Sequence, residues 1–518
     1  MKAVYKIGMF LLAVSFIALV FSFSLSRFKL TDDILKNDLG GIKSEGGVSA
    51  YELVKPFSDE MTGKEYTSRS EFISDYYKLF EKGNQAQTDD KNKIWEVNLF
   101  FVVKHSSTGL ITHPVYGKVL FAIAFLLFCF SALLMIYARY YSATDGIKHN
   151  DIFKKSISAG GWIGILIGTF LIGFYIVLYF YPEYITNWVI LVDPVSYLLT
   201  GNEASQWFLY GFIYTLAMLT MGVRMYLKYR GNRYQQIRTF SVLGFQTIMA
   251  FLLPSLIKEL HGHDLKDIWP LKYDYFADYN VDYHLGEQAT FSATLVYLWG
   301  IFLLLVGIPL FTYFFGKRWY CSWVCGCGGL AETVGDPFRQ LSSKKLIAWK
   351  VERILIHSIL VFAFIMTVLL ILAMNQMFDE KMAKSIFGWY GFLIGSVFSG
   401  VIGTGFYPIL GNRIWCRFGC PLAAYIGLFQ KYFSKFRITV NGGQCISCGN
   451  CSAYCEMGID VRSYAQKGQN IVRASCVGCG VCSSVCPRGV LKLENGPAKT
   501  RVDENPIIIG HEGVKIRN

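Results

Sequence analysis

The chain has 518 residues, of which 53% are hydrophobic, 16% aromatic and only 17% charged. These fractions, with a mean hydropathy of +0.35, exclude an ordinary soluble globular protein and predict a multi-span α-helical membrane protein. The formal net charge of +13 does not indicate nucleic-acid binding, because the lysines and arginines cluster at the ends of apolar segments, as in membrane proteins.

The N-terminal part predicts a membrane anchor followed by a small domain. Residues 1–27 contain an apolar run behind two lysines, which predicts an uncleaved anchor; removal as a signal peptide is the alternative. Residues 28–115 are mixed polar and lack cysteine, so we expect an extracytoplasmic domain, mostly helical, with apolar periodicity around 76–80 and 95–103. We expect His105 and His113 to be surface or membrane-interface histidines.

Further apolar runs are long enough to cross a bilayer, at about 118–141, 159–182, 207–227, 239–258, 291–315, 354–374 and 389–410. We therefore expect about eight transmembrane helices, with helices 2–5 within 116–258 and helices 6–8 within 291–433. Basic residues follow the second, fourth, sixth and eighth spans, whereas 183–206 has no lysine or arginine. This alternation predicts a multi-pass protein of the bacterial inner membrane with cytoplasmic N- and C-termini. Cys129, inside the second span, is expected to be a packing residue.

The loop at 259–290 is predicted to lie outside the membrane and is rich in tyrosine and aspartate. Its side chains could bind a metal through His261, His263 and Asp264, with His284 joining them. We favour a simpler interpretation, in which the loop forms an aromatic belt at the membrane interface with solvated carboxylates.

Two ten-residue stretches, 316–325 and 411–420, share the pattern G-x-R-x-aromatic-C-x3-C. Each follows a span that ends at the predicted cytoplasmic face and precedes an amphipathic segment, 328–350 or 421–433. The pattern predicts an internal repeat that relates the spans 291–315 and 389–410.

The repeat carries the cysteines Cys321, Cys325, Cys416 and Cys420. On a helix, C-x3-C spacing places both thiols on one face, and two such pairs supply four soft ligands for an iron or iron–sulfur centre. Cys327 follows closely in the first copy, so either Cys325 or Cys327 could be the ligand. Arg318 and Arg413, at equivalent positions, could steer a quinone head group, lower the tendency of a cluster to donate electrons, or simply anchor the chain at the membrane surface.

Residues 445–486 contain two runs of C-x2-C-x2-C-x3-C. Three closely spaced thiolates cover one face of a [4Fe–4S] cluster, and in two-cluster ferredoxins the fourth cysteine of each run ligates the other cluster. We therefore assign Cys445, Cys448, Cys451 and Cys486 to one cluster and Cys476, Cys479, Cys482 and Cys455 to the other. Zinc does not require three cysteines in x2 steps, and disulfides are disfavoured in a reducing cytoplasm.

The two runs predict a cytoplasmic α+β two-cluster bacterial ferredoxin-like domain at 434–495. Residues 496–518 are polar and are expected to form a tail. Gly449 and Gly480 stand in the tight loops, where a positive φ is expected. The first run ends Cys455–Glu456, where the usual pattern has proline.

The second half, about residues 291–490, resembles the membrane-bound polyferredoxins of the NosR/NapH/CcoG type. The resemblance rests on CSWVC and CRFGCP followed by two ferredoxin runs; the first copy lacks the family's proline and adds Cys327. It implies a protein that passes electrons across or into the membrane, to periplasmic reductases or for copper-site assembly. Flavin and Rossmann motifs are not found, and His357 has no matching histidine for haem.

We therefore predict a membrane-bound iron–sulfur protein that passes electrons between a cytoplasmic donor or the quinone pool and a membrane or periplasmic acceptor. Two [4Fe–4S] clusters and a third cysteine-bound centre would be its cofactors, and membrane lipid and redox proteins its partners. Because the chain offers no evident acid, base or nucleophile, an electron-transfer subunit is favoured over a stand-alone enzyme. The alternatives are a reductase for copper or haem–copper site assembly and a redox sensor.

Overall fold

The computed structural model describes residues 1–44, 46–94, 99–141, 161–257, 265, 268–495, 507–510 and 513–516. His261, His263 and Asp264 lie outside the described residues. The chain divides into two compact units, one formed by 1–142 with 176–216 and the other by 143–175 with 217–518.

Among the described residues, eight helices are long and apolar enough to cross a membrane, which confirms the predicted number. A helix satisfies its backbone hydrogen bonds internally, so its surface can be apolar throughout. The chain is therefore a multi-pass membrane protein. Five of the spans contain more than one element: Lys2–Ser24 (α1, Lys2–Phe21, and a 3-10 turn), Tyr116–Tyr140 (α6, Tyr116–Phe121, and α7, Leu127–Tyr140), Arg233–Leu256 (α11, Arg233–Gly244, and α12, Leu253–Leu256), Phe291–Phe315 (α14, Phe291–Phe302, and α15, Ile308–Phe315) and Glu380–Gly405 (α19, Glu380–Tyr390, and α20, Gly403–Gly405). The other three are Trp162–Phe180 (α8), Gln206–Lys228 (α10) and Leu346–Met374 (α18).

The first unit contains a small domain built on a three-stranded antiparallel sheet of order β2-β1-β3. Its strands are β1 (Ser26–Lys29), β2 (Glu65–Tyr66) and β3 (Ser107–Gly109), and its helices are α2 (Asp32–Leu39), α3 (Ala50–Val54), α4 (Arg69–Gln85), α5 (Phe100–His105) and α9 (Thr186–Thr200). Aromatic contacts of Phe72 with Phe28 and Tyr66 join α4 to the sheet. The sheet was not predicted, because strands of two to four residues are too short to show alternation.

His105 is exposed, as expected of a surface histidine, and lies between two carboxylates of this unit. Its Nδ1 is 2.9 Å from Asp38 and its Nε2 is 3.0 Å from Glu203. Its hydrogen bond with Asp38, assisted by Glu203, raises the pKa of His105 to about 9, although burial opposes the shift. The neighbouring Lys104 is buried and contacts Asp193 and Glu203 at 2.9 and 2.8 Å.

A pH-dependent contribution to stability follows. Because the folded pKa of His105 is raised above 6.5, its contribution should be complete below pH 6.5 and disappear as the pH rises through about 9. The side chain is 35% exposed, so we expect less than about 1 kcal/mol. Thermal unfolding of the wild type and Asp38→Asn between pH 6 and 10 tests this. An unchanged pH profile in Asp38→Asn would contradict it.

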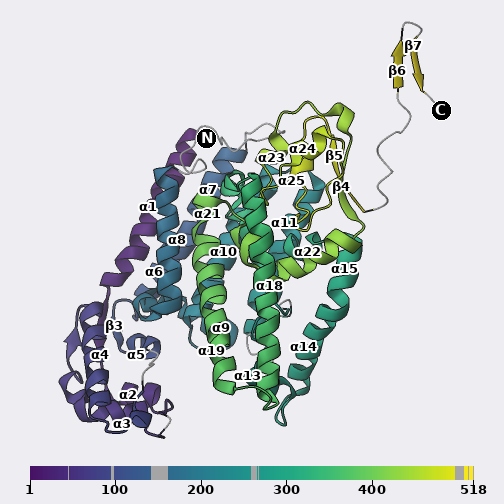
Figure 1. The fold of residues 1–518 in the computed structure, drawn as a ribbon. Coiled ribbons are helices and arrows are strands. Elements are labelled where there is room, and N and C mark those ends of the chain that lie inside the picture. Colours follow the sequence, from purple (N-terminus) through teal and green to yellow (C-terminus); the bar gives the residue numbers. More distant parts are fainter. Residues whose placement is uncertain are drawn as a thin grey trace. The chain divides into compact units, whose positions relative to one another are not determined.

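The second unit carries the ferredoxin segment over one end of its helices (Figure 1). Strands β4 (Phe436–Val440) and β5 (Leu491–Asn495) form an antiparallel pair. Between them in sequence lie the short helices α23 (Asn450–Ala453), α24 (Val461–Gln466) and α25 (Val481–Ser484). Helix α22 (Pro421–Phe433) packs against α15 (Ile308–Phe315) and α18. The remaining elements are α13 (Asp278–Leu285), α16 (Arg318–Cys321), α17 (Gly326–Thr333), α21 (Tyr407–Leu410), β6 (Ile507–Gly510) and β7 (Gly513–Ile516).

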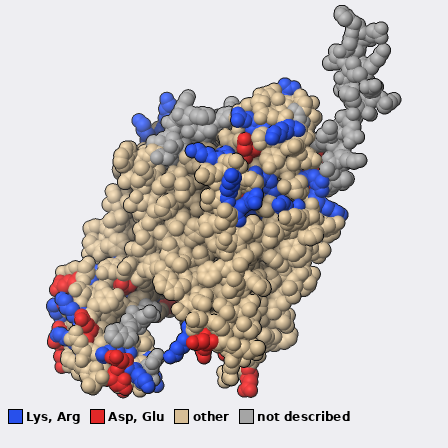
Figure 2. All heavy atoms as spheres, viewed as in Figure 1, with Lys and Arg blue, Asp and Glu red and all other residues tan. Residues whose placement is uncertain are grey.

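Charge is distributed unevenly over this unit. Figure 2 shows lysines and arginines gathered around the end that carries the ferredoxin segment, next to a broad uncharged face. This distribution agrees with helices that end in basic residues at one side of a membrane.

Candidate functional site

Four cysteines of the ferredoxin segment line one small cavity: Cys445, Cys448, Cys451 and Cys486. We call them the first ferredoxin group. Cys455, although it closes the first run in sequence, does not line this cavity. Gly449 adopts a φ of +79°, as predicted, and begins α23, which positions Cys451.

The second ferredoxin group consists of Cys455, Cys476, Cys479 and Cys482. Electrostatic interactions link Cys482 to the other three. Gly480, with a φ of +73°, begins α25, which carries Cys482. The backbone N–H of Ile459 donates to Cys455 Sγ at 3.4 Å, a contact that favours a thiolate. Cys482 also interacts with Cys451, so the two groups are neighbours.

The two C-x3-C copies share a backbone geometry. Gly316 and Gly411 both have a positive φ, +68° and +98°, which lets the chain turn sharply after each span. The N–H of Cys325 donates to the carbonyl of Tyr320 at 2.8 Å, five residues back, and Cys420 donates to Trp415 in the same way at 2.8 Å. Cys325 and Cys420 then stand at the N-caps of α17 and α22. The internal repeat is therefore present in the fold.

The repeat brings together Cys321, Cys325, Cys327, Cys416 and Cys420, which we call the repeat group. Cys420 interacts with Cys416, Cys325 and Cys321, and Cys327 contacts Cys325. Burial raises the pKa of Cys321 to about 12 and holds the pKa of Cys420 well above its ordinary value. A metal would have to displace these protons to bind.

Two expectations about the repeat were wrong. The thiols of one pair do not lie on one helical face, because the widened turn separates Cys321, at the end of α16, from Cys325, at the start of α17. Residues 328–350 are also not one amphipathic segment: α17 ends at Thr333, and Gly335 and Pro337 start a 3-10 helix. Residues 421–433 do form one helix, α22.

Hydrogen bonds of neighbouring residues connect the segments that carry the repeat group and the second ferredoxin group. Ser322 Oγ, next to Cys321, donates to the carbonyl of Val477, next to Cys476, at 2.7 Å and is fully buried. Gln430 of α22 donates to the carbonyl of Cys476 at 2.7 Å and accepts from the N–H of Lys317 at 2.6 Å. The segments that carry the two groups therefore meet at a buried, hydrogen-bonded boundary.

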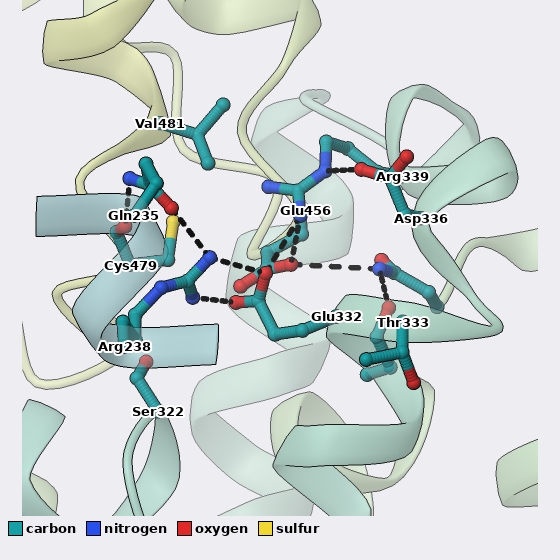
Figure 3. Close-up of polar contacts among 12 residues, drawn as sticks. Gln235, Arg238, Ser322, Glu332, Thr333, Asp336, Arg339, Glu456, Cys479 and Val481 are labelled. Carbon is teal, nitrogen blue, oxygen red and sulfur yellow. Dashed lines mark hydrogen bonds and ion pairs between the residues drawn. The ribbon is translucent and has the colours of Figure 1, made fainter. Parts of the chain in front are cut away.

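A buried network of charged residues lies at the same boundary (Figure 3). Glu332 of α17 accepts from Arg238, Arg339 and Arg413 at 2.8, 2.8 and 2.7 Å. Burial alone would raise the pKa of Glu332, but the three guanidinium groups outweigh it and hold the pKa well below its ordinary range. This carboxylate is therefore ionised.

Two further carboxylates complete the network. Asp336 accepts from Arg224, Lys228 and Arg339 at 2.8, 2.8 and 3.1 Å. Glu456, the residue at the usual proline position, is fully buried and lies 3.0 Å from Arg413. Its departure from the ferredoxin pattern therefore has a structural role, which sequence reasoning noticed but did not interpret.

Arg413 connects this network to the repeat group. Its Nη1 lies 3.7 Å from Cys416 Sγ and donates to the carbonyl of Cys321 at 3.3 Å. The side chain is 1% exposed, so the expectation that Arg413 anchors the chain at the membrane surface was wrong. Its equivalent Arg318 is half-buried and contacts Asn495 and the ring of Phe436 in the ferredoxin segment.

The balance of charge in this network bears on whether anionic clusters fit beside it. Its five cations face three carboxylates, and Arg413 Nε and Arg339 Nη1 are buried without a hydrogen-bond partner among the described residues. Cluster thiolates would supply the missing negative charge, so the residues present fit iron–sulfur clusters. Glu332, Glu456 and Cys479 also have ligand atoms within 4.8 Å of one another, but the surrounding arginines disfavour a further cation there.

The other residues singled out in the sequence make contacts of their own. His284 is buried, 2.7 Å from the carbonyl of Asn280, and its ring packs against Tyr297. His113 contacts the ring of Tyr116, and Cys129 is half-buried in α7 (Leu127–Tyr140). His357 of α18 is 2.7 Å from the carbonyl of Arg353.

Comparison with known families identifies the class of protein. A family described as "4Fe-4S dicluster domain" matches residues 444–491, and one described as "4Fe-4S binding domain" matches twice, at 297–346 and 389–440. The double match covers both C-x3-C copies and confirms the internal repeat. The chain therefore carries ferredoxin-type 4Fe-4S domains and is a membrane-associated iron–sulfur electron-transfer protein.

Curated relatives are similar over part of the chain. YccM of Escherichia coli, named as a candidate electron transport protein, is 25% identical over 171 residues, which cover 29% of this chain and 44% of the relative. The methylamine utilization ferredoxin-type protein MauN of Methylobacillus flagellatus is 26% identical, over 40% of this chain and 71% of the relative. The uncharacterized protein MJ0749 of Methanocaldococcus jannaschii is 27% identical, over 29% and 55%. No solved structure matches this chain.

Proposed function

We propose that the protein passes electrons between a cytoplasmic donor or the quinone pool and an acceptor in the membrane or the periplasm. The observation that supports this most directly is the shared boundary of the repeat group and the second ferredoxin group, closed by the buried bond from Ser322 to Val477. A ferredoxin segment that was only anchored to the membrane would not need cysteines at this boundary.

Two [4Fe–4S] clusters would be held by the first and second ferredoxin groups. A third iron or iron–sulfur centre would be held by Cys321, Cys325, Cys416 and Cys420, because Cys325 is the backbone equivalent of Cys420 while Cys327 is not. When bound, such clusters supply one-electron redox chemistry. Arg413 and Arg238 hold positive charge beside Cys416 and Cys479, which favours the more reduced state of a bound cluster.

The alternative interpretations gain no specific support. A metal-assembly reductase would be expected to hold a metal in its outer regions, and of the candidate ligands at 259–290 only His284 is described, in a contact with a backbone carbonyl. A redox sensor would not need the repeat group, whereas an electron carrier needs both cysteine sets.

Replacement of Cys416 and Cys420 by serine tests the proposal. The double variant is expected to contain less iron and acid-labile sulfide than the wild type and to keep the electron paramagnetic resonance signals of the ferredoxin groups. In proteoliposomes with external dithionite and enclosed ferricyanide, it should lose electron transfer across the membrane. Identical iron content and spectra in both proteins would show that the third centre does not exist. Electron transfer at the wild-type rate in the variant would contradict the proposed route.

A further inference from the structure

A cavity of about 580 Å³ lies between the first turns of α18, helix α22 and residues 472–475. Only one cysteine, Cys416, lines it, so it is distinct from the space between the thiols of any of the three groups. Trp349, Arg353 and His357 reach it from α18 at four-residue spacing, which places them on one face of that helix.

The lining is strongly basic. It contains one carboxylate, Glu352, which Arg417 Nε already engages at 2.6 Å. None of the other four cations has a carboxylate partner among the described residues; they are Lys317, Arg353, Lys431 and Arg473. Unpaired cations around one cavity repel one another, and a bound anion would relieve that repulsion.

Part of this charge is built into the interior. Lys317 is 1% exposed and Arg417 is 3% exposed, and Arg417 Nη2 is buried without a hydrogen-bond partner among the described residues. Buried donors are normally hydrogen-bonded, so an acceptor is missing at this position. At the mouth, Arg353 and Arg473 lie over the ring of Trp349, with centroid distances of 5.0 and 4.8 Å, which orders two arginines from separate elements.

The position of the cavity favours a lipid over a soluble anion. It opens at the charged end of a 29-residue apolar helix, α18, where the head groups of a bilayer lie. Large apolar side chains at its rim are exposed, including Ile354, at 71%, and Tyr432, at 65%. These would be unfavourable in water and suit acyl chains beside a polar head group.

We propose that this cavity binds the phosphate head group of an anionic phospholipid, such as phosphatidylglycerol, with its acyl chains against the apolar rim. Basic pockets between transmembrane helices are suited to such head groups. The proposal is independent of the electron route, although a lipid phosphate here would lie next to Cys416 and its centre.

Native mass spectrometry in a neutral detergent, with short-chain phosphatidylglycerol as the titrated ligand, tests the proposal. The wild type should bind about one phosphatidylglycerol tightly, and short-chain phosphatidylcholine at least tenfold more weakly. Arg353→Gln/Arg473→Gln should weaken phosphatidylglycerol binding about tenfold or more, because two cations at the mouth are lost. Its iron content and spectra should stay unchanged, which shows that the variant is folded.

The matched control removes two exposed cations that do not line the cavity, Lys350 of α18 and Lys467. Lys350→Gln/Lys467→Gln should bind phosphatidylglycerol like the wild type. If both double variants lost the same amount of phosphatidylglycerol binding, the effect would come from general surface charge, and the proposed site would be wrong. Displacement of the lipid by glycerol 3-phosphate or inorganic phosphate at the same concentration would overturn the lipid assignment in favour of a soluble anion.

Discussion

Replacement of Cys455 by serine is expected to remove the same iron–sulfur signal as replacement of Cys479, although Cys455 belongs to the other cysteine run. The cavity of the first ferredoxin group is lined by Cys486 and not by Cys455, while Cys455 interacts with Cys476 and Cys482. Loss of one ligand typically degrades or removes its own cluster, a change of up to about four iron atoms per chain. Electron paramagnetic resonance of the reduced variants, with iron analysis, measures it.

The comparison needs two further variants. Cys448→Ser should affect the other signal, because Cys448 lines the first cavity, and Cys129→Ser, in α7, should leave every signal intact. If Cys455→Ser instead reproduced the spectrum of Cys448→Ser, each run would hold its own cluster. The assignment of Cys455 to the cluster of the second run would then be wrong.

Replacement of Glu332 by glutamine is expected to cause the largest loss of stability among single changes at the boundary. The neutral side chain would leave Arg238, Arg339 and Arg413 buried without their shared charge, and breaking a buried ion pair in this way costs about 3–5 kcal/mol. Equilibrium unfolding in mixed micelles measures the free energy, and the spectra of the neighbouring centres report the local damage.

Glu380→Gln is the matched control. Glu380 pairs with Lys384 at 2.6 Å, but both side chains are more than half exposed, and exposed pairs contribute about 1 kcal/mol or less. A loss in Glu332→Gln no larger than in Glu380→Gln would show that the network is not needed for the fold.

The membrane helices and the cysteine runs could be predicted because each follows from a local rule. A span needs a fixed length of apolar residues, and a cluster needs thiols at short, fixed spacings. For the same reason the positive φ of Gly449 was foreseeable. The equivalence of Gly316 and Gly411, and of the turns after them, followed from one repeated pattern.

The charged boundary could not be predicted, since its partners are far apart in sequence. An arginine after an apolar span has the same local pattern whether it faces lipid head groups, as expected for Arg413, or is buried against Glu332. The informative residues were the isolated carboxylates Glu332 and Asp336 in a segment rich in glycine and apolar residues, and Glu456 in place of proline. A carboxylate that is buried at such a position needs a cation as partner, because an unpaired buried charge is unfavourable.

The same network has a consequence for the order in which the protein forms. Arg224, Lys228 and Arg238 are synthesised long before Glu332 and Asp336, their partners in the finished fold. Until these carboxylates are present, we expect the three cations to stay hydrated and to keep the connection between α10 and α11 out of the bilayer. Only when the later segments arrive are they enclosed. One set of side chains thus serves first as a topology signal during biogenesis and afterwards as the interior of the mature protein.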